Sequence, residues 1–143
     1  MAKAIKKKQV KVSRLKNKKV LALVAVVAII IVALSILLFV YQKNKSSAIA
    51  EATNWSIVLR DRGITIRVCK SAYNLTTRTT TYKYLVTSEA GWSSKFGIGS
   101  TNNSIAPYGF KSGTVTGTNN GTVAWITTMW VATTIYPSSV KSC

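Results

Sequence analysis

The sequence predicts a single N-terminal transmembrane α-helix followed by an all-β domain, which we expect to be an antiparallel β-sandwich or a small barrel. Residues 20–41 form an unbroken apolar run in which Ser35 is the only clearly polar side chain. Beyond Ala52 the composition changes, because all 17 threonines, all four tryptophans and all eight glycines lie there. Threonine and the aromatic residues suit a pleated, half-buried surface. The two observations together predict a helix in the bilayer and strands outside it.

The apolar run is long enough to cross a bilayer. A helix rises about 1.5 Å per residue, so residues 20–41 give roughly 33 Å, against a hydrocarbon core of about 30 Å. A cleaved signal peptide has a shorter apolar region with a small-residue cleavage site soon after it. Here the Ala-x-Ala match at Ala48 and Ala50 lies well beyond the run. We therefore expect residues 20–41 to be an uncleaved signal anchor.

A basic tail precedes this run. Residues 1–19 carry nine lysine and arginine side chains and no acid, whereas only Lys43 and Lys45 lie close to the other end of the run. By the positive-inside rule, the tail is cytoplasmic and the C-terminal domain is extracytoplasmic. The tail also suits contact with anionic lipid headgroups. A nucleic-acid-binding arm is the alternative, which the absence of interleaved aromatic residues in the tail disfavours.

Two segments follow the membrane. Residues 42–53 predict a juxtamembrane stalk or a helical extension that ends near Thr53 or Asn54. Residues 54–143 form the predicted β domain. Its turns are marked by glycine and asparagine clusters at residues 97–99 and 119–121.

Alternation of apolar and polar residues predicts several strands in the β domain. In residues 63–70 the side chains of Ile64, Ile66 and Val68 share one face, which we expect to be buried. Residues 79–87 are the expected hairpin partner, across a turn near residues 73–77. Residues 122–135 are apolar on both faces, which predicts a central strand or a pair of strands.

Seven or so short strands in about 90 residues favour an antiparallel sandwich over an α/β arrangement. In architecture such a domain is similar to immunoglobulin-like domains. The cysteine and tryptophan spacing of antibody domains is not matched, because the second cysteine, Cys143, is the last residue of the sequence. A generic sandwich or small barrel is therefore the predicted fold.

The two cysteines both lie on the predicted extracytoplasmic side, where disulfides persist. With an even count there is one intramolecular pairing, Cys69 with Cys143. Closing a loop of this length disfavours the unfolded chain by about 4 kcal/mol in the entropic account, so we expect a structural bridge. An intermolecular bridge through Cys143 is the alternative.

Catalytic signatures are missing from the sequence. The chain has no histidine, and its acids are Glu51, Asp61 and Glu89 alone. The usual groups for acid-base catalysis and for metal binding are therefore scarce. We expect a protein that is not an enzyme and that holds no metal and no cofactor.

Two sets of residues are candidates for ligand contact. Residues 42–143 carry eleven basic side chains against three acids, a balance that favours polyanions such as a cell-surface polymer or an acidic glycan. The candidate anion-binding residues are Arg60, Arg62, Arg67, Lys70, Arg78 and Lys83. Aromatic residues in a Gly/Ser-rich stretch suit stacking on sugars. The candidate aromatic contacts are Trp92, Phe96, Tyr108 and Phe110.

These features predict a membrane-anchored, surface-exposed β domain for non-catalytic binding or adhesion, with an anionic ligand. The alternative is a structural subunit of an envelope, pilus-like or virion assembly, in which the chain forms homo-oligomers or packs against assembly partners. Binding predicts a monomeric ectodomain that retains an anionic ligand. Assembly predicts oligomers in detergent that depend on protein concentration.

Overall fold

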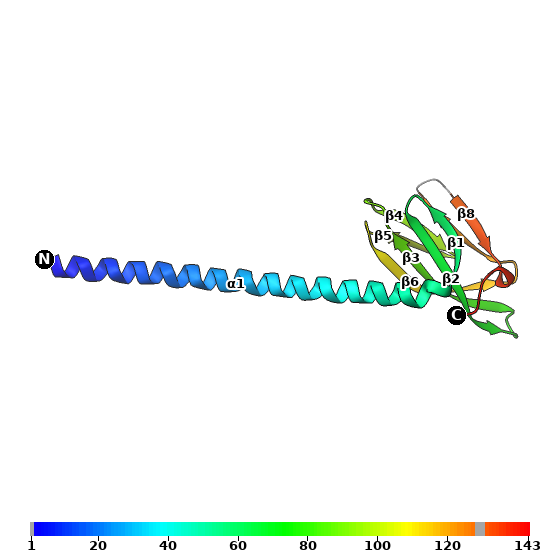
Figure 1. Cartoon of the computed structure of the whole chain (residues 1–143), viewed down its shortest axis with the longest axis horizontal. Coiled ribbons are helices and arrows are strands. Elements are labelled where there is room, and N and C mark those ends of the chain that lie inside the picture. The colour runs from blue at the N-terminus through cyan, green and yellow to red at the C-terminus, as the bar shows by residue number, and fades with distance from the viewer. Residues whose placement is uncertain (1, 128–130) are drawn as a thin grey trace. The chain divides into compact units, whose positions relative to one another are not determined.

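The computed structural model describes residues 2–127 and 131–143, with side chains from Lys18 onward. The chain forms two compact units, Met1–Asn44 and Lys45–Cys143. The first unit is helical. The second contains the end of the same helix and all the strands (Figure 1).

Helix α1 (Ala2–Glu51) is continuous over 50 residues and is drawn from blue to cyan in Figure 1. Within the described residues, one helix is long and apolar enough to cross a membrane, over Lys18–Asn54. Its lone polar side chain in the apolar run is satisfied locally, since the Ser35 hydroxyl donates to the Ile31 carbonyl at 2.8 Å. The structure thus supports a single-pass membrane protein. Beyond the apolar run the helix continues, so the segment predicted as a stalk or helical extension is helical.

A short 3₁₀ turn, η1 (Ala52–Asn54), follows α1 and leads into the strands. Within the described residues, eight strands form two antiparallel sheets of four, which confirms a helix followed by a β-sandwich. Sheet 1 has the order β1-β2-β3-β6, with bounds β1 (Ser56–Asp61), β2 (Ile64–Asn74), β3 (Thr79–Ser88) and β6 (Phe110–Thr118). Sheet 2 has the order β5-β4-β7-β8, with bounds β5 (Thr101–Ile105), β4 (Ser94–Ile98), β7 (Thr122–Ile126) and β8 (Val131–Ile135).

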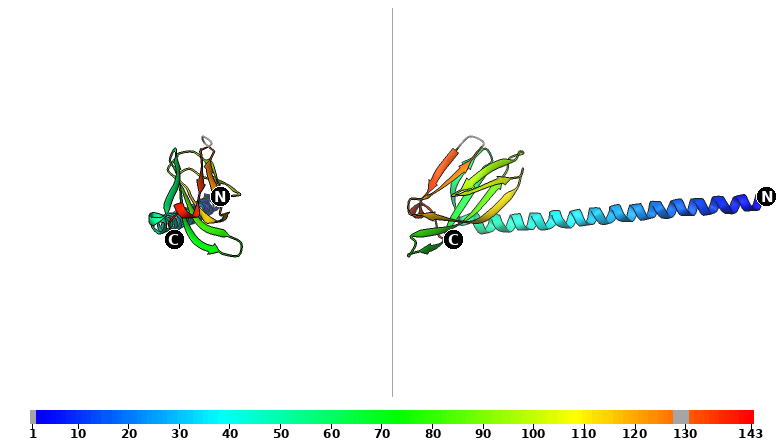
Figure 2. Two further views of the ribbon diagram at one scale, coloured as in Figure 1. Left: turned by 90° about the vertical axis from the view of Figure 1, so that its right-hand side faces the viewer. Right: turned by 180° about the vertical axis from the view of Figure 1, so that it is seen from behind.

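The predicted hairpin is present as β2 and β3. Ile64, Ile66 and Val68 are fully buried and pair with Ser88, Val86 and Tyr84 of β3. The alternation of apolar and polar residues predicted the buried face of β2 correctly. It did so because one face of this hairpin fills the core while polar side chains occur on the other. In each view the tip of the hairpin, drawn in green, extends beyond the rest of the sandwich (Figure 2).

The apolar segment at residues 122–135 contains a pair of strands. Thr122 of β7 pairs with Ile135 of β8, and Ile126 pairs with Val131. Strand β7 lies between β4 and β8, while β8 lies at the sheet edge beside β1 of sheet 1 (Figure 1). The predicted alternation also included residues 128–130, which lie outside the described residues. On sheet 2, Gly97 pairs with Trp125, and the Trp125 indole ring lies over the glycine. A Cβ atom at position 97 would clash with this ring.

The core lies between the two sheets. Its largest fully buried side chains include Tyr82 and Phe96, with isoleucines from both sheets. Phe96 of β4 meets Tyr84 of β3 edge to face, with ring centroids 6.2 Å apart. Burial raises the pKa of the Tyr82 phenol above its ordinary value, so the phenol stays neutral.

The outer face of sheet 1 is also partly covered. Leu85 and Cys69 alternate with the core-facing residues of their strands, yet they are buried. At the end of α1, Ala52 is buried, and the Glu51 carboxylate accepts from the Lys83 amino group at 3.5 Å. Because Lys83 and Leu85 share this face, the ion pair brings the last turn of α1 to it.

Candidate functional site

The sandwich has two ends that differ in composition. Strand β2 has 11 residues, which separates its two ends by roughly 33 Å. We call one end the Lys45 end: it contains the turn at residues 62–63 and the loops at residues 89–93 and 106–109. We call the other the hairpin end: it contains residues 70–79 of the β2–β3 hairpin and the C-terminal segment 140–143.

Hydrogen bonds join the elements of the Lys45 end. The Lys45 amino group donates to the carbonyl of Tyr108 at 2.6 Å, and the Tyr108 amide donates to the carbonyl of Ala90 at 3.1 Å. The Glu89 amide in turn donates to the carbonyl of Gly63 at 2.7 Å. The end of α1, both loops and the β1–β2 turn therefore form one connected structure.

The disulfide organises the hairpin end. The sulfur atoms of Cys69 and Cys143 lie 1.99 Å apart, at bonding distance, in agreement with the predicted pairing. The C-terminal segment lies along β2, because the Lys70 amide donates to the Lys141 carbonyl at 2.8 Å and the Cys143 amide donates to the Lys70 carbonyl at 3.0 Å. The Lys141 amide also donates to the Ser56 hydroxyl at 3.1 Å. The C-terminal segment thus continues the edge that β1 begins.

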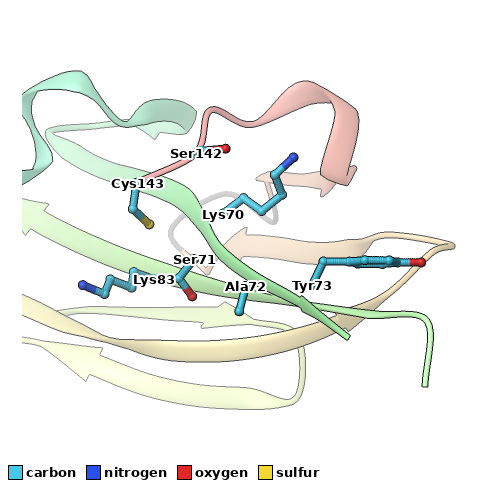
Figure 3. A pocket seen from close by; sticks show the side chains of 7 residues that line it. All are labelled: Lys70, Ser71, Ala72, Tyr73, Lys83, Ser142 and Cys143. Carbon is cyan, nitrogen blue, oxygen red and sulfur yellow. The ribbon is translucent and has the colours of Figure 1, made fainter. Parts of the chain in front are cut away.

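A shallow groove of about 370 Å³ lies beside the disulfide (Figure 3). Its wall follows β2 through an irregularity between Lys70 and Ala72, where Ser71 donates to the Thr81 carbonyl at 3.1 Å. In Figure 3 the side chains of Lys70 and Lys83 point away from each other, and the Tyr73 ring extends away from Cys143. The two amino groups therefore do not converge on one small anion. The residues lining the groove are Lys70, Ser71, Ala72, Tyr73, Lys83, Ser142 and Cys143.

The structure divides the six candidate anion-binding residues among three places. Arg60 and Arg62 are exposed at the Lys45 end. Arg67 and Lys83 lie on the outer face of sheet 1, where Arg67 reaches Thr87 at 3.4 Å and Lys83 pairs with Glu51. Lys70 and Arg78 lie at the hairpin end, with Arg78 in the turn between β2 and β3.

Lys141 joins this last pair, although the sequence pattern did not indicate it. It is exposed, and its backbone pairs with Lys70. The signal that would have found it was the predicted bridge, since a Cys69–Cys143 bond brings residue 141 close to residue 70.

The four candidate aromatic residues also separate. Trp92 and Tyr108 are exposed, at 51% and 62%, in the two loops of the Lys45 end. Phe110 is partly buried at the start of β6. Phe96 is fully buried in the core, so the expectation that it contacts a ligand is corrected: its ring packs against Tyr84 and is closed to solvent.

Among the described residues, no group of three or more His, Cys, Asp or Glu side chains comes together. Comparison of the chain with known protein families, with curated proteins and with solved structures found no significant match. Function is therefore argued from the placement of this chain's own side chains.

Proposed function

We propose that this protein anchors a β-sandwich on the extracytoplasmic side of a membrane and that the hairpin end binds anionic polymers without catalysis. Two features support the orientation. The basic tail of residues 1–19 favours the cytoplasm for the N-terminus. A disulfide persists in an oxidising compartment, and the Cys69 and Cys143 sulfurs lie at bonding distance.

The observation that carries the ligand class is the separation of charge within the sandwich. The hairpin end holds Lys70, Arg78 and Lys141. Of the acidic side chains of the sequence, Glu51 pairs with Lys83 beside the groove, and the other two acids flank the turn and loop of the Lys45 end. The hairpin end therefore carries more cations than acidic side chains, and such a surface attracts polyanions.

Exposed apolar groups accompany these cations. Tyr73 is 48% exposed and Leu75 is 81% exposed, both near the tip that extends from the sandwich. A tyrosine ring offers a face for stacking on a sugar and a hydroxyl for hydrogen bonding. The combination favours an anionic glycan over a bare polyphosphate.

The spacing of the cations favours a polymer over a small anion. Lys70 points away from Lys83 across the groove (Figure 3). Arg78 lies in the turn beyond β2. Single cations spaced along a surface each meet a different charge of an extended chain, and such contacts weaken as salt rises. We therefore expect binding to be strongly salt-dependent.

The triple variant Lys70→Gln/Arg78→Gln/Lys141→Gln tests the proposal. Each cation near an anionic surface contributes about 1 kcal/mol. Loss of three therefore weakens binding by about 3 kcal/mol, on the order of 100-fold. The measurement is titration of the full chain in non-ionic detergent with heparin, a sulfated glycan, and with uncharged dextran, at two salt concentrations.

A matched control removes the same charge from the other end. The variant Arg62→Gln/Lys95→Gln/Lys111→Gln loses three exposed cations at or next to the loops of the Lys45 end, and we expect it to keep nearly all of the heparin affinity. Equal weakening by both triple variants would show that net charge alone attracts the polymer and would contradict a site at the hairpin end. Concentration-dependent oligomers without polymer binding would favour an assembly subunit instead.

A further inference from the structure

We propose that the Lys45 end is a membrane-seating surface, with Trp92 and Tyr108 resting in the headgroup region of the bilayer that α1 crosses. The proposal concerns the opposite end of the sandwich from polymer binding and does not depend on it. The occupant is the lipid surface itself. The argument rests on chain connectivity, on exposed aromatic rings and on charge.

Connectivity places this end near the point where the chain leaves the apolar run. Lys45 follows Tyr41, the last residue of that run, by four positions, which is about 6 Å of helical rise. The Lys45 amino group donates a hydrogen bond to the Tyr108 carbonyl, and both residues belong to the second unit. The loop that carries Tyr108 is therefore within reach of the Lys45 side chain, and Lys45 itself is close to the end of the apolar run.

The exposed rings at this end are of the kinds that prefer the membrane interface. Trp92 is 51% exposed and Tyr108 is 62% exposed. Both side chains combine an apolar ring with one polar group, which matches the boundary between headgroups and acyl chains. They belong to adjoining loops, because the Tyr108 amide is bonded to Ala90 and the Tyr108 hydroxyl lies next to Gly91.

The backbone at Tyr108 is held in a conformation that few side chains adopt. Its φ is +53°, in the left-handed region that glycine occupies more readily. The neighbouring Gly109 is bonded to the Ala106 carbonyl at 3.0 Å, which closes the turn. A strained position that carries a large, exposed ring is more consistent with a role for the ring than with a role in folding.

Charge at this end also suits a lipid surface. Five cations and two acids lie at or next to the turn and loops. The cations are Lys45, Arg60, Arg62, Lys95 and Lys111, and the acids are Asp61 and Glu89. The surplus of cations favours headgroup phosphates.

Quenching by brominated lipid tests the proposal on the full chain. The protein is reconstituted in vesicles of phosphatidylcholine brominated near the carboxyl end of its acyl chains, and in matched vesicles without bromine. We expect bromine to quench part of the tryptophan fluorescence of the wild-type protein. Trp92→Phe removes most of that quenching. The control Trp125→Phe, which removes a partly buried indole from sheet 2, keeps it.

A second variant guards against loss of folding. Tyr108→Gly suits the positive φ, so we expect an unchanged melting temperature together with weaker quenching of Trp92. The proposal is overturned if Trp92→Phe and Tyr108→Gly both retain the wild-type quenching, or if Trp125→Phe removes as much as Trp92→Phe. Heparin titration of the same samples tests polymer binding at the hairpin end. A failure of the membrane-seating proposal is therefore distinguishable from a failure of the polymer-binding proposal.

Discussion

Replacing Cys69 and Cys143 by serine is expected to lower the free energy of unfolding of the sandwich by about 4 kcal/mol. The bridge joins residues 74 positions apart, so its loss frees a long loop in the unfolded chain. It also releases the C-terminal segment, which holds Lys141 beside Lys70. The measurement is denaturant unfolding of the full chain in detergent, with and without reductant.

Reductant is the internal control for this prediction. It is expected to destabilise the wild-type protein by the same amount and to leave the Cys69→Ser/Cys143→Ser variant unchanged. Mass spectrometry under non-reducing conditions would show a monomer lighter by two hydrogen atoms than the dithiol form. Two free thiols in a stable fold would contradict the intramolecular bridge and remove one support for the extracytoplasmic side, while a disulfide-linked dimer would favour the intermolecular alternative through Cys143.

Phe96→Ala is expected to lower the free energy of unfolding by about 3–5 kcal/mol, because it removes a fully buried ring from the core. The lost contacts include the edge-to-face pair with Tyr84. Trp92→Ala is the matched control, since it removes an aromatic ring that is half exposed in the same stretch of sequence. We expect the control to cost about 1 kcal/mol or less. Urea unfolding monitored by circular dichroism compares the two variants.

The heparin affinity of the two variants completes this comparison. Phe96→Ala acts through stability, so under conditions where it stays folded its affinity should equal that of the wild-type protein. Equal destabilisation by Phe96→Ala and Trp92→Ala would show that Phe96 is not a core residue. Weaker heparin binding by a folded Phe96→Ala protein would restore it as a ligand contact.

The features that the sequence predicted well are those set by local pattern. The apolar run determines the helix because a charge-free stretch of that length has few other stable environments. Alternation at Ile64, Ile66 and Val68 predicted the buried face of β2, since a strand with one face in the core repeats every two residues. The cysteine pairing followed from the count alone.

What the sequence could not give depends on contacts between distant segments. Trp92 and Phe96 are both aromatic and four residues apart, but only Phe96 faces β3, and only the packing of the two sheets determines that. The six basic residues are close in sequence, yet an 11-residue strand carries Arg62 and Arg78 to opposite ends. Lys141 comes beside Lys70 through tertiary structure.

The membrane topology is the central claim, and amine labelling tests it directly. Intact cells that express the full chain are treated with a membrane-impermeant amine-reactive reagent, and the labelled peptides are identified by mass spectrometry. We predict labels on exposed lysines of the sandwich, such as Lys95, Lys111 and Lys141, and none on the tail of residues 1–19 until the cells are permeabilised. Labelling of the tail in intact cells, with the sandwich protected, would contradict the proposed orientation and with it the extracellular polymer ligand.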